Sequence, residues 1–282
     1  MTYNMIMDKK LHLTQTIGPV SAKVLQKLIG QGKTIFTLDE ACEVYAHSRQ
    51  ETTDLLRDLV NRGVLARIKS GVFMTLQMGQ EQSQLTNWPL IARLLIGDND
   101  YYLSHYSAMR LHGMTTHPVM DVLITTSRRI KSKKIQHFVY RFIYTKPEHC
   151  WGKVELWVTK QEKVYVSDLE RTLLDGLDRS DLCGGIKEII RGIWVKQQKF
   201  DWHKLVFYAK RYHSRAAVKR LGFILETLNV GEDYLPSLEK TILSAKDYIL
   251  LDPDGSKSGK YYSRWRIQIN INRDELKESV WG

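Results

Sequence analysis

The sequence predicts an α+β protein with two domains, the larger of which has a small sheet and a helical carboxy-terminal part. Three observations predict this class. Two capping boxes, which mark helix starts, lie eleven residues apart ahead of a hairpin signal. Runs of β-branched and aromatic residues follow between residues 120 and 166, and helical periodicity then dominates from Ile186 to Ser244.

The first domain is expected at residues 1–80. Pro19 favours a helix start, and the extended piece Thr34-Ile35-Phe36 follows that helix. Two further helices should begin at about residues 38 and 49, because a hydroxyl stands three residues before a glutamate at both places: Thr37-Leu-Asp-Glu40 and Ser48-Arg-Gln-Glu51.

A hairpin closes this domain. Alternating apolar segments in VLARIKSGVFMTL flank Lys69-Ser70-Gly71 and predict two paired strands. The order helix, short strand, helix, helix, hairpin is that of a winged helix-turn-helix, a fold that typically places its last helix in the major groove of DNA. Residues 77–87 are polar and aperiodic, which predicts a linker and a domain boundary near residue 80.

The second domain is expected at residues 81–282. NWPLIARLL and LSHYSAMRLHG predict helices, and four segments predict the small sheet: DVLITT, HFVYRFIY, VELWVT and KVYV. Ser167-Asp-Leu-Glu170 is a third capping box that should open the helix DLERTLLDGLDR, in which Arg171 should pair locally. Strand character returns near the end in YILL and RWRIQININ.

Composition and charge indicate a folded protein with an anionic partner. The chain is 43% hydrophobic and 26% charged, which is ordinary for a globular protein. Its formal net charge of +11 is spread as about +3 for residues 1–80, +3 for 81–180 and +5 for 181–282. Such an excess favours a polyanion, and a merely basic globular protein is the alternative.

Cysteine usage and the chain start predict a cytoplasmic protein. Cys42, Cys150 and Cys183 are too few and too far apart for a disulfide framework or a structural zinc site. The start MTYNMIMDKK becomes charged before an apolar run develops, so it does not resemble a signal peptide. The most apolar window, WPLIARLLIG, contains Arg93 and is too short to span a bilayer, so no membrane partner is expected.

The helix from Arg49 to Asn61 should have one side that packs on the domain. A turn of about 100° per residue places five residues there: Thr52, Leu55, Leu56, Leu59 and Val60. The candidates for DNA contact are the amino-terminal and outward residues of this helix and two cations of the hairpin: Ser48, Arg49, Gln50, Thr53, Arg57, Arg67 and Lys69. Asp54 shares the outer face and fits it least, because a carboxylate facing DNA lowers affinity unless a cytosine amine donates to it. A helix-turn-helix used for protein contact is the alternative.

Four segments occur in an order that spans most of the chain: VNRGVLARIKSGVFM, YYLSHYSAMRLHGM, VSDLERTLLDGL, and YILLDP followed by SGKYYSRWRIQIN. In that order and spacing the chain resembles the AbiEi family. This family is the antitoxin and autorepressor half of bicistronic type IV toxin–antitoxin systems of bacteria, first known from abortive phage infection.

The resemblance implies two functions and no enzymatic activity. The winged helix would bind inverted repeats in double-stranded operator DNA ahead of its own operon and repress it. Residues 81–282 would counteract a nucleotidyltransferase-like partner toxin without a stable complex. The DNA-binding role attaches to six of the candidates above: Arg49, Gln50, Thr53, Arg57, Arg67 and Lys69. Whether two copies bind as a preformed dimer or as cooperating monomers stays open.

Two basic clusters in the second domain are further candidates for nucleic-acid contact, RNA included. One lies between two predicted strands: Arg128, Arg129, Lys131, Lys133 and Lys134. The other recurs at helical spacing: Lys204, Arg211, Arg215 and Lys219. Tyr208 and Tyr212 stand beside the second cluster, where rings can stack on bases. A solvated charged face is the alternative for both.

Neither a metal nor a cofactor is expected. His105, His112 and His117 lie close in sequence, but no Asp, Glu or Cys joins them at the spacing of a metal site. Helix packing and polar surface are the favoured roles of these histidines.

Two alternative functions stay open. One is a free-standing winged-helix regulator. The other is a DNA-targeted, metal-dependent nuclease, for which Asp121 and Glu155 on two strands would hold the metal. Trp157 stands where the assisting lysine of such a nuclease is needed, which counts against the second alternative.

Overall fold

Two compact units make up the chain, Met1–Thr86 and Asn87–Gly282. The computed structural model describes residues 17–31, 33–76, 88–97, 100–135, 137–158, 162–272, 274–276 and 280. The predicted boundary near residue 80 and the predicted linker, 77–87, lie outside these described residues. Among the helices of the described ranges, none has the length and apolar character that a membrane crossing requires.

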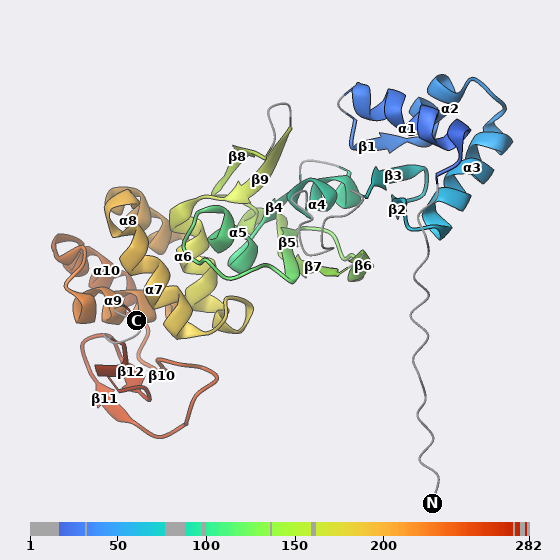
Figure 1. The fold of residues 1–282 in the computed structure, drawn as a ribbon. Helices are drawn as coiled ribbons and strands as arrows, with labels where there is room; N and C mark the ends of the chain where they lie inside the picture. Colours follow the sequence, from blue (N-terminus) through green and yellow to red (C-terminus); the bar gives the residue numbers. More distant parts are fainter. Residues whose placement is uncertain are drawn as a thin grey trace, which may run out of the picture. The chain divides into compact units, whose positions relative to one another are not determined.

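Unit 1 has the element order that the sequence predicts (Figure 1). Its elements are α1 (Pro19–Gly30), β1 (Ile35–Thr37), α2 (Leu38–Tyr45), α3 (Arg49–Asn61), β2 (Leu65–Lys69) and β3 (Val72–Thr75). Both predicted capping boxes are formed, at Thr37 and at Ser48, which confirms the predicted helix starts. The strands form one antiparallel sheet in the order β1-β3-β2. The hairpin turns through Gly71, whose φ of +70° is one that glycine adopts without strain.

The core of unit 1 lies between the helices and this sheet. Leu28 of α1 and Leu56 of α3 are fully buried, and the rings of Phe36 and Phe73 stack with centroids 6.2 Å apart. The predicted inner side of α3 is confirmed, because its residues are buried or pack partly buried against the core: Thr52, Leu55, Leu56, Leu59 and Val60.

A six-stranded mixed sheet forms one part of unit 2, in the order β6-β7-β5-β4-β9-β8. The elements of this part are α4 (Trp88–Ile96), β4 (Tyr101–Leu103), α5 (His105–Leu111), β5 (Asp121–Thr126), β6 (Lys133–Ile135), β7 (Phe138–Tyr144), β8 (Lys153–Trp157) and β9 (Lys163–Ser167). Strands β5, β7, β8 and β9 confirm the four predicted strands. The sequence did not predict β4 and β6, because three residues are too few for an alternating pattern. These strands form by pairing, β4 with β5 and β6 with β7.

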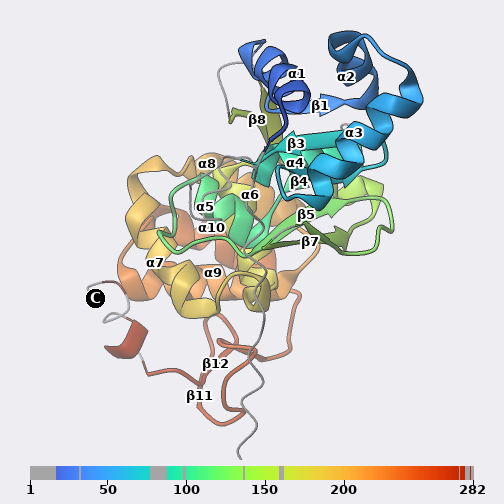
Figure 2. The same ribbon diagram turned by 45° about the vertical axis from the view of Figure 1, so that its right-hand side comes forward.

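Helices form the other part of unit 2, as predicted for residues 186–244. They are α6 (Leu169–Asp178), α7 (Ile186–Lys196), α8 (Trp202–Arg211), α9 (Arg215–Leu228) and α10 (Leu235–Ile242). Single 3-10 turns occur at Pro147–His149, Ser180–Leu182, Gln197–Lys199 and Glu232–Tyr234. A small sheet of β10 (Ile249–Leu250), β11 (Lys260–Tyr262) and β12 (Ile267–Ile269) lies beyond the helices, as Figures 1 and 2 show.

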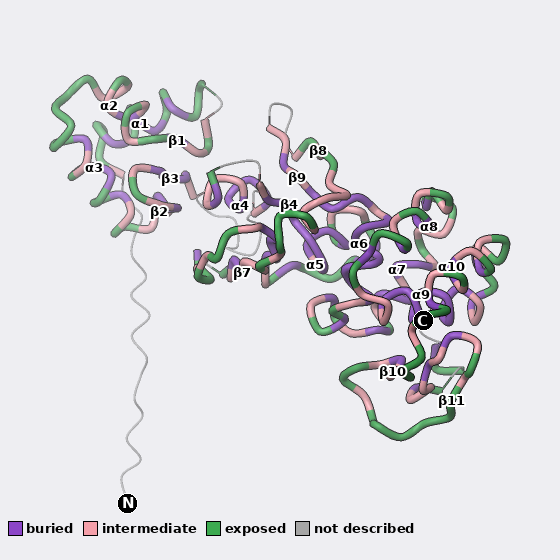
Figure 3. The backbone as a smooth tube through the Cα atoms, turned by 180° about the vertical axis from the view of Figure 1, so that it is seen from behind, coloured by how far each residue is buried: buried purple, intermediate pink, exposed green. Residues whose placement is uncertain are grey.

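Helix α6 joins the two parts of unit 2. It packs on α5, α7, α8 and α9, and eight consecutive residues, from Glu170 to Leu177, are buried, which Figure 3 shows in purple. The predicted capping box at Ser167 is wrong. Asp168 is the N-cap and accepts from the Arg171 N–H at 2.8 Å, because Ser167 is the last residue of β9 and its hydroxyl contacts that of Thr172.

Candidate nucleic-acid interface

The turn between α2 and α3 determines how the candidate recognition helix begins. Ala46 ends α2 in the left-handed conformation, with φ 59°, and its N–H donates to the Cys42 carbonyl. Two residues later Ser48 caps α3. The hydroxyl of Ser48 accepts from the Glu51 N–H, and Glu51 accepts in return from the Ser48 N–H at 3.0 Å. The Ser48 hydroxyl, which donates to the Glu51 carboxylate at 2.6 Å, and the Ser48 N–H lower the pKa of Glu51, so its negative charge is used to start the helix.

Arg49 stands at the exposed amino-terminal end of α3. Its guanidinium pairs with Asp39 in the first turn of α2, and the two side chains are 65% and 73% exposed. The hydrogen bond from Arg49 to Asp39 raises the pKa of Arg49. Because exposed ion pairs are weak, Arg49 can exchange Asp39 for a phosphate or a guanine at little cost.

Asp54 lies between Gln50 and Arg57, two predicted DNA-contact residues of the outer face of α3. Gln50 donates from Nε2 to one Asp54 oxygen at 3.0 Å, and Arg57 donates to the other at 2.8 Å. The carboxylate that fitted a DNA-facing surface least well therefore links Gln50 and Arg57 into one row. All three side chains are exposed.

Thr53 is placed less favourably than predicted. It is half-buried, and its hydroxyl donates to the Arg49 carbonyl at 2.7 Å. A threonine in a helix commonly makes this bond to the preceding turn. Its hydroxyl is therefore engaged within α3.

The hairpin carries the remaining two predicted contacts of unit 1. Arg67 is exposed and donates to the Ser70 hydroxyl at 3.5 Å, and Lys69 is half-buried. The pairing of β2 with β3 shifts register between these two cations, where Ile68 enters the core with no exposed surface. Helix α3 packs on β2, so the outer row of α3 and the two cations belong to one packed unit.

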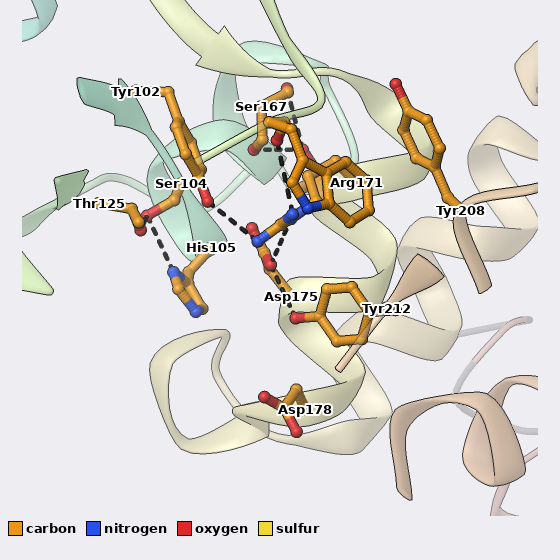
Figure 4. A network of polar contacts seen from close by, with 12 residues as sticks. Tyr102, Ser104, His105, Thr125, Ser167, Arg171, Asp175, Asp178, Tyr208 and Tyr212 are labelled. Carbon is orange, nitrogen blue, oxygen red and sulfur yellow. Dashed lines mark hydrogen bonds and ion pairs between the residues drawn. The ribbon is translucent and has the colours of Figure 1, made fainter. Parts of the chain in front are cut away.

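Unit 2 contains a buried polar network around Arg171 (Figure 4). The guanidinium lies 4.3 Å from the Trp151 ring centroid, 5.0 Å from that of Tyr212 and 5.8 Å from that of Tyr102. It donates to Asp175 at 2.8 Å and to the Tyr102 hydroxyl at 3.1 Å. The predicted local pairing of Arg171 is confirmed by Asp175, four residues on.

The amino-terminal end of α6 forms the rim of this network. Lys204 of α8 lies 3.1 Å from Asp168 and 2.8 Å from Glu170, and Tyr208 donates to Asp168 at 2.8 Å. Burial lowers the pKa of Lys204, but the hydrogen bonds and charges of Glu170 and Asp168 outweigh burial. The net result is a raised pKa, so Lys204 stays charged. Burial, together with Asp168, raises the pKa of Tyr208 to about 12. Lys204 and Tyr208 therefore serve the protein's own carboxylates.

The second predicted basic cluster does not form a charged outer face. Lys219 is completely buried, and its ammonium contacts Asp247 through the carbonyl at 2.5 Å and the carboxylate at 3.2 Å. Arg215 donates to the Ala209 carbonyl at 3.1 Å, and Arg211 lies 4.4 Å from the Trp151 ring. The predicted surface role of Lys219 is wrong, because its charge is used to join α9 to the chain ahead of β10.

Tyr212 is likewise unsuited to stack on a base. Its ring is 2% exposed, and its hydroxyl donates to Asp175 at 2.8 Å. Helical spacing alone did not show this, because α8 ends at Arg211 and Tyr212 turns into the core.

The three histidines have structural surroundings. His105 is buried and lies 2.9 Å from the Ser104 hydroxyl, which accepts from Thr125 at 2.7 Å. Burial lowers the pKa of His105. His112 donates to the Ser167 carbonyl at 2.6 Å. His117 is exposed, and among the described residues no group of three His, Cys, Asp or Glu side chains is arranged to hold a metal.

The carboxylates of the nuclease hypothesis are far apart. Asp121 is on β5 and Glu155 on β8, and two strands separate these in the sheet. Three strand spacings amount to about 14 Å, which is too far for one metal. Each carboxylate has its own cation, Arg141 for Asp121 and Lys163 for Glu155, both at 2.8 Å.

The similarity to known proteins lies in the fold. No protein-family model matches the chain, and no curated protein matches it. Among solved structures, the chain is similar to the crystal structure of the RV2827C protein from Mycobacterium tuberculosis. The TM-score is 0.72, the identity is 11%, and the match covers 95% of this chain and 96% of that one. At this identity the likeness shows a shared α+β fold over nearly the whole length.

Proposed function

We propose that unit 1 is a winged-helix module that binds double-stranded DNA through α3 and the β2–β3 hairpin. The observation that carries this proposal is the set of exposed polar residues at the start of α3 and along its outer row: Ser48, Arg49, Gln50 and Arg57. The opposite side of the same helix is buried, so the row faces outward on a rigid support. Arg67 and Lys69 of the hairpin add cations of the kind that meet phosphates or a minor groove.

The residue types in this row suit the major groove. Glutamine bonds adenine through two atoms, and arginine bonds guanine or a phosphate. Recognition helices read bases mainly with their amino-terminal residues, and in α3 Arg49 and Gln50 are exposed. The net charge of +11 favours the same polyanionic partner.

We further propose that the protein is a cytoplasmic bacterial autorepressor and antitoxin without enzymatic activity. The resemblance to the AbiEi family supports this second proposal. In it, the DNA module represses the protein's own operon by binding inverted repeats, and unit 2 counteracts a nucleotidyltransferase-like toxin.

A gel-shift experiment on the DNA upstream of the gene tests the first proposal. Arg49→Ala and Gln50→Ala should each weaken binding by about 1–3 kcal/mol. Lys23→Ala, an exposed cation on α1, is the matched control and should bind as the wild type does. Binding that is indifferent to both α3 substitutions would move recognition away from this helix.

Co-expression with a neighbouring nucleotidyltransferase-like gene product tests the second proposal. The chain with both Arg49→Ala and Gln50→Ala should lose repression and still neutralise the toxin. If no such gene adjoins this one, the free-standing regulator is the better assignment.

A further inference from the structure

One edge of the six-stranded sheet is strongly basic. Residues 127–148 contain seven arginines and lysines against one acidic residue, Glu148. We call the five cations of the loop 127–132 and of strand β6 the basic edge: Arg128, Arg129, Lys131, Lys133 and Lys134. This is the first of the two predicted clusters, and β6 is the outermost strand of the sheet (Figure 1).

The topology places an aromatic ring beside these cations. Strands β5 and β7 are parallel, so the loop that leaves β5 starts at the end of the sheet where Tyr144 ends β7. The Arg129 guanidinium lies 4.3 Å from the centroid of the Tyr144 ring, and Tyr144 is 45% exposed. A planar cation and a ring therefore stack at an exposed corner.

Within the described residues, acids do not balance three of the five charges of this edge. The ion pairs nearby are Arg141 with Asp121 at 2.8 Å and Lys146 with Glu148 at 3.9 Å. Across the described ranges of the chain, no ion pair involves three of the basic edge residues: Arg129, Lys131 and Lys134.

The opposite edge of the same sheet differs in this respect. There Lys163 pairs with Glu155 at 2.8 Å and also lies 4.5 Å from the Trp157 ring centroid. Arg93 of α4 pairs with Glu162 at 2.5 Å. The imbalance is thus a property of one edge and not of the sheet as a whole.

Protection of an open strand is the simplest competing role. Lysines on an edge strand prevent pairing with another chain, and Lys133 and Lys134 suit that task. The explanation does not extend to Arg129 or Lys131, which precede the strand, nor to the exposed stack on Tyr144. Those groups suit a ligand with both phosphates and an accessible aromatic face.

We infer that the basic edge of unit 2 binds single-stranded RNA. The cations follow the phosphate backbone, and Tyr144 with Arg129 receives an unstacked base. A duplex keeps its bases stacked on one another, so it offers no such face. This inference goes beyond the proposed function, because it uses neither α3 nor the hairpin.

Salt-dependent binding of the full-length chain tests the inference. The probe is a fluorescent single-stranded RNA of roughly 16 nucleotides and mixed sequence, measured by anisotropy. The triple variant Arg129→Gln, Lys131→Gln, Lys134→Gln should reduce the slope of log affinity against log salt by about 2. The matched control removes the same charge from exposed positions outside the basic edge: Lys199→Gln, Lys240→Gln and Lys246→Gln. Its slope should equal that of the wild type.

Two variants leave strand β6 intact and keep the test valid if the triple variant aggregates. Arg129→Gln with Lys131→Gln should reduce the slope by about 1.4. Tyr144→Leu should weaken RNA binding by about 5- to 140-fold with little change in slope.

The outcomes separate this inference from the DNA-binding proposal. Edge variants should bind the upstream duplex DNA as the wild type does, and Arg49→Ala should bind RNA as the wild type does. Equal weakening of RNA binding by the edge and control variants would overturn the inference, as would wild-type RNA binding by both β6-intact variants.

Discussion

The guanidinium of Arg171 and the carboxylate of Asp175 form an ion pair of 2.8 Å, in which the side chains are only 3% and 4% exposed. Oδ1 of Asp175 accepts from both Arg171 and Tyr212, whereas Oδ2 is buried and has no hydrogen-bond partner among the described residues. The charge of Asp175 therefore depends on Arg171, and the pair lies where the sheet of unit 2 meets its helices.

Arg171→Met should lower the free energy of unfolding by about 3–5 kcal/mol, because it leaves the buried Asp175 charge uncompensated. Chemical denaturation measures this loss. The double variant Arg171→Met, Asp175→Leu should be less destabilised than Arg171→Met alone, because no unpaired charge remains. Arg57→Ala, which breaks an exposed pair with Asp54, is the control and should cost less than about 1 kcal/mol. A loss for Arg171→Met as small as that of the control would contradict this account.

Gly222→Ala should destabilise unit 2 by about 3 kcal/mol, since overpacking a filled core forces neighbours to move. A Cβ at this position of α9 would lie 2.1 Å from the ring of Trp265, which is fully buried. Thermal unfolding followed by circular dichroism measures the loss. Gly30→Ala at the end of α1 is the comparison, because nothing lies within 4 Å of its added methyl group. Equal melting of Gly222→Ala and the wild type would show that Trp265 can move aside.

The stability of unit 2 should fall as the pH drops below about 6.5, where an unfolded histidine takes up a proton. Burial lowers the pKa of His105, so the native state resists that proton and the unfolded state gains it. Above this pH the His105 imidazole is neutral in both the native and the unfolded state, so its contribution to the free energy of unfolding is fully present. The slope due to one such histidine reaches at most about 1.4 kcal/mol per pH unit.

His105→Asn isolates this contribution. Asparagine tolerates the left-handed backbone of His105, with φ 50°, and does not titrate. Urea unfolding at about pH 7 and about pH 5.5 should show a smaller pH effect in the variant than in the wild type. His112, whose pKa burial also lowers, should account for part of the remaining effect. An identical pH effect in both proteins would rule out the role of His105.

Asp54→Asn should tighten binding of the upstream DNA roughly fivefold, or about 1 kcal/mol, because it removes a negative charge from the outer row of α3. Gel shifts at two salt concentrations measure the change. Asp58→Asn is the comparison, because Asp58 pairs with Arg62 at 2.9 Å near the far end of α3, and its effect should be smaller. Weaker binding by Asp54→Asn would mean that the positioning of Gln50 and Arg57 outweighs the repulsion.

The candidate DNA interface was largely predictable from sequence. The start of α3 and its inner side follow from a capping box and a period of 3.6 residues, both of which act within a few residues of chain. Two details were not predictable. The Thr53 hydroxyl, which was expected to face DNA, donates to the Arg49 carbonyl instead. The Asp54 carboxylate, which fitted a DNA-facing surface least well, accepts hydrogen bonds from Gln50 and Arg57.

The second basic cluster shows that a sequence pattern does not predict whether a charged side chain is exposed. The predicted cluster recurs at helical spacing, as Lys204, Arg211, Arg215 and Lys219, but spacing along a helix does not say what packs against it. Lys204 meets two carboxylates at the start of α6, and Lys219 is covered by the chain ahead of β10. The basic edge differs because a loop and an outermost strand have fewer neighbours to cover them.

The sequence by itself determined the α+β class, the order of the elements of unit 1 and the inner side of α3, because these depend on residues close together in the chain. Only the tertiary structure decided which charged side chains, such as Lys204 and Lys219, pair with the protein's own acidic groups. It also supplied strands β4 and β6 and brought Tyr102, Arg171 and Tyr212 together. Such contacts join residues far apart in the chain, and whether a charge stays exposed or is neutralised depends on the neighbours that folding places beside it.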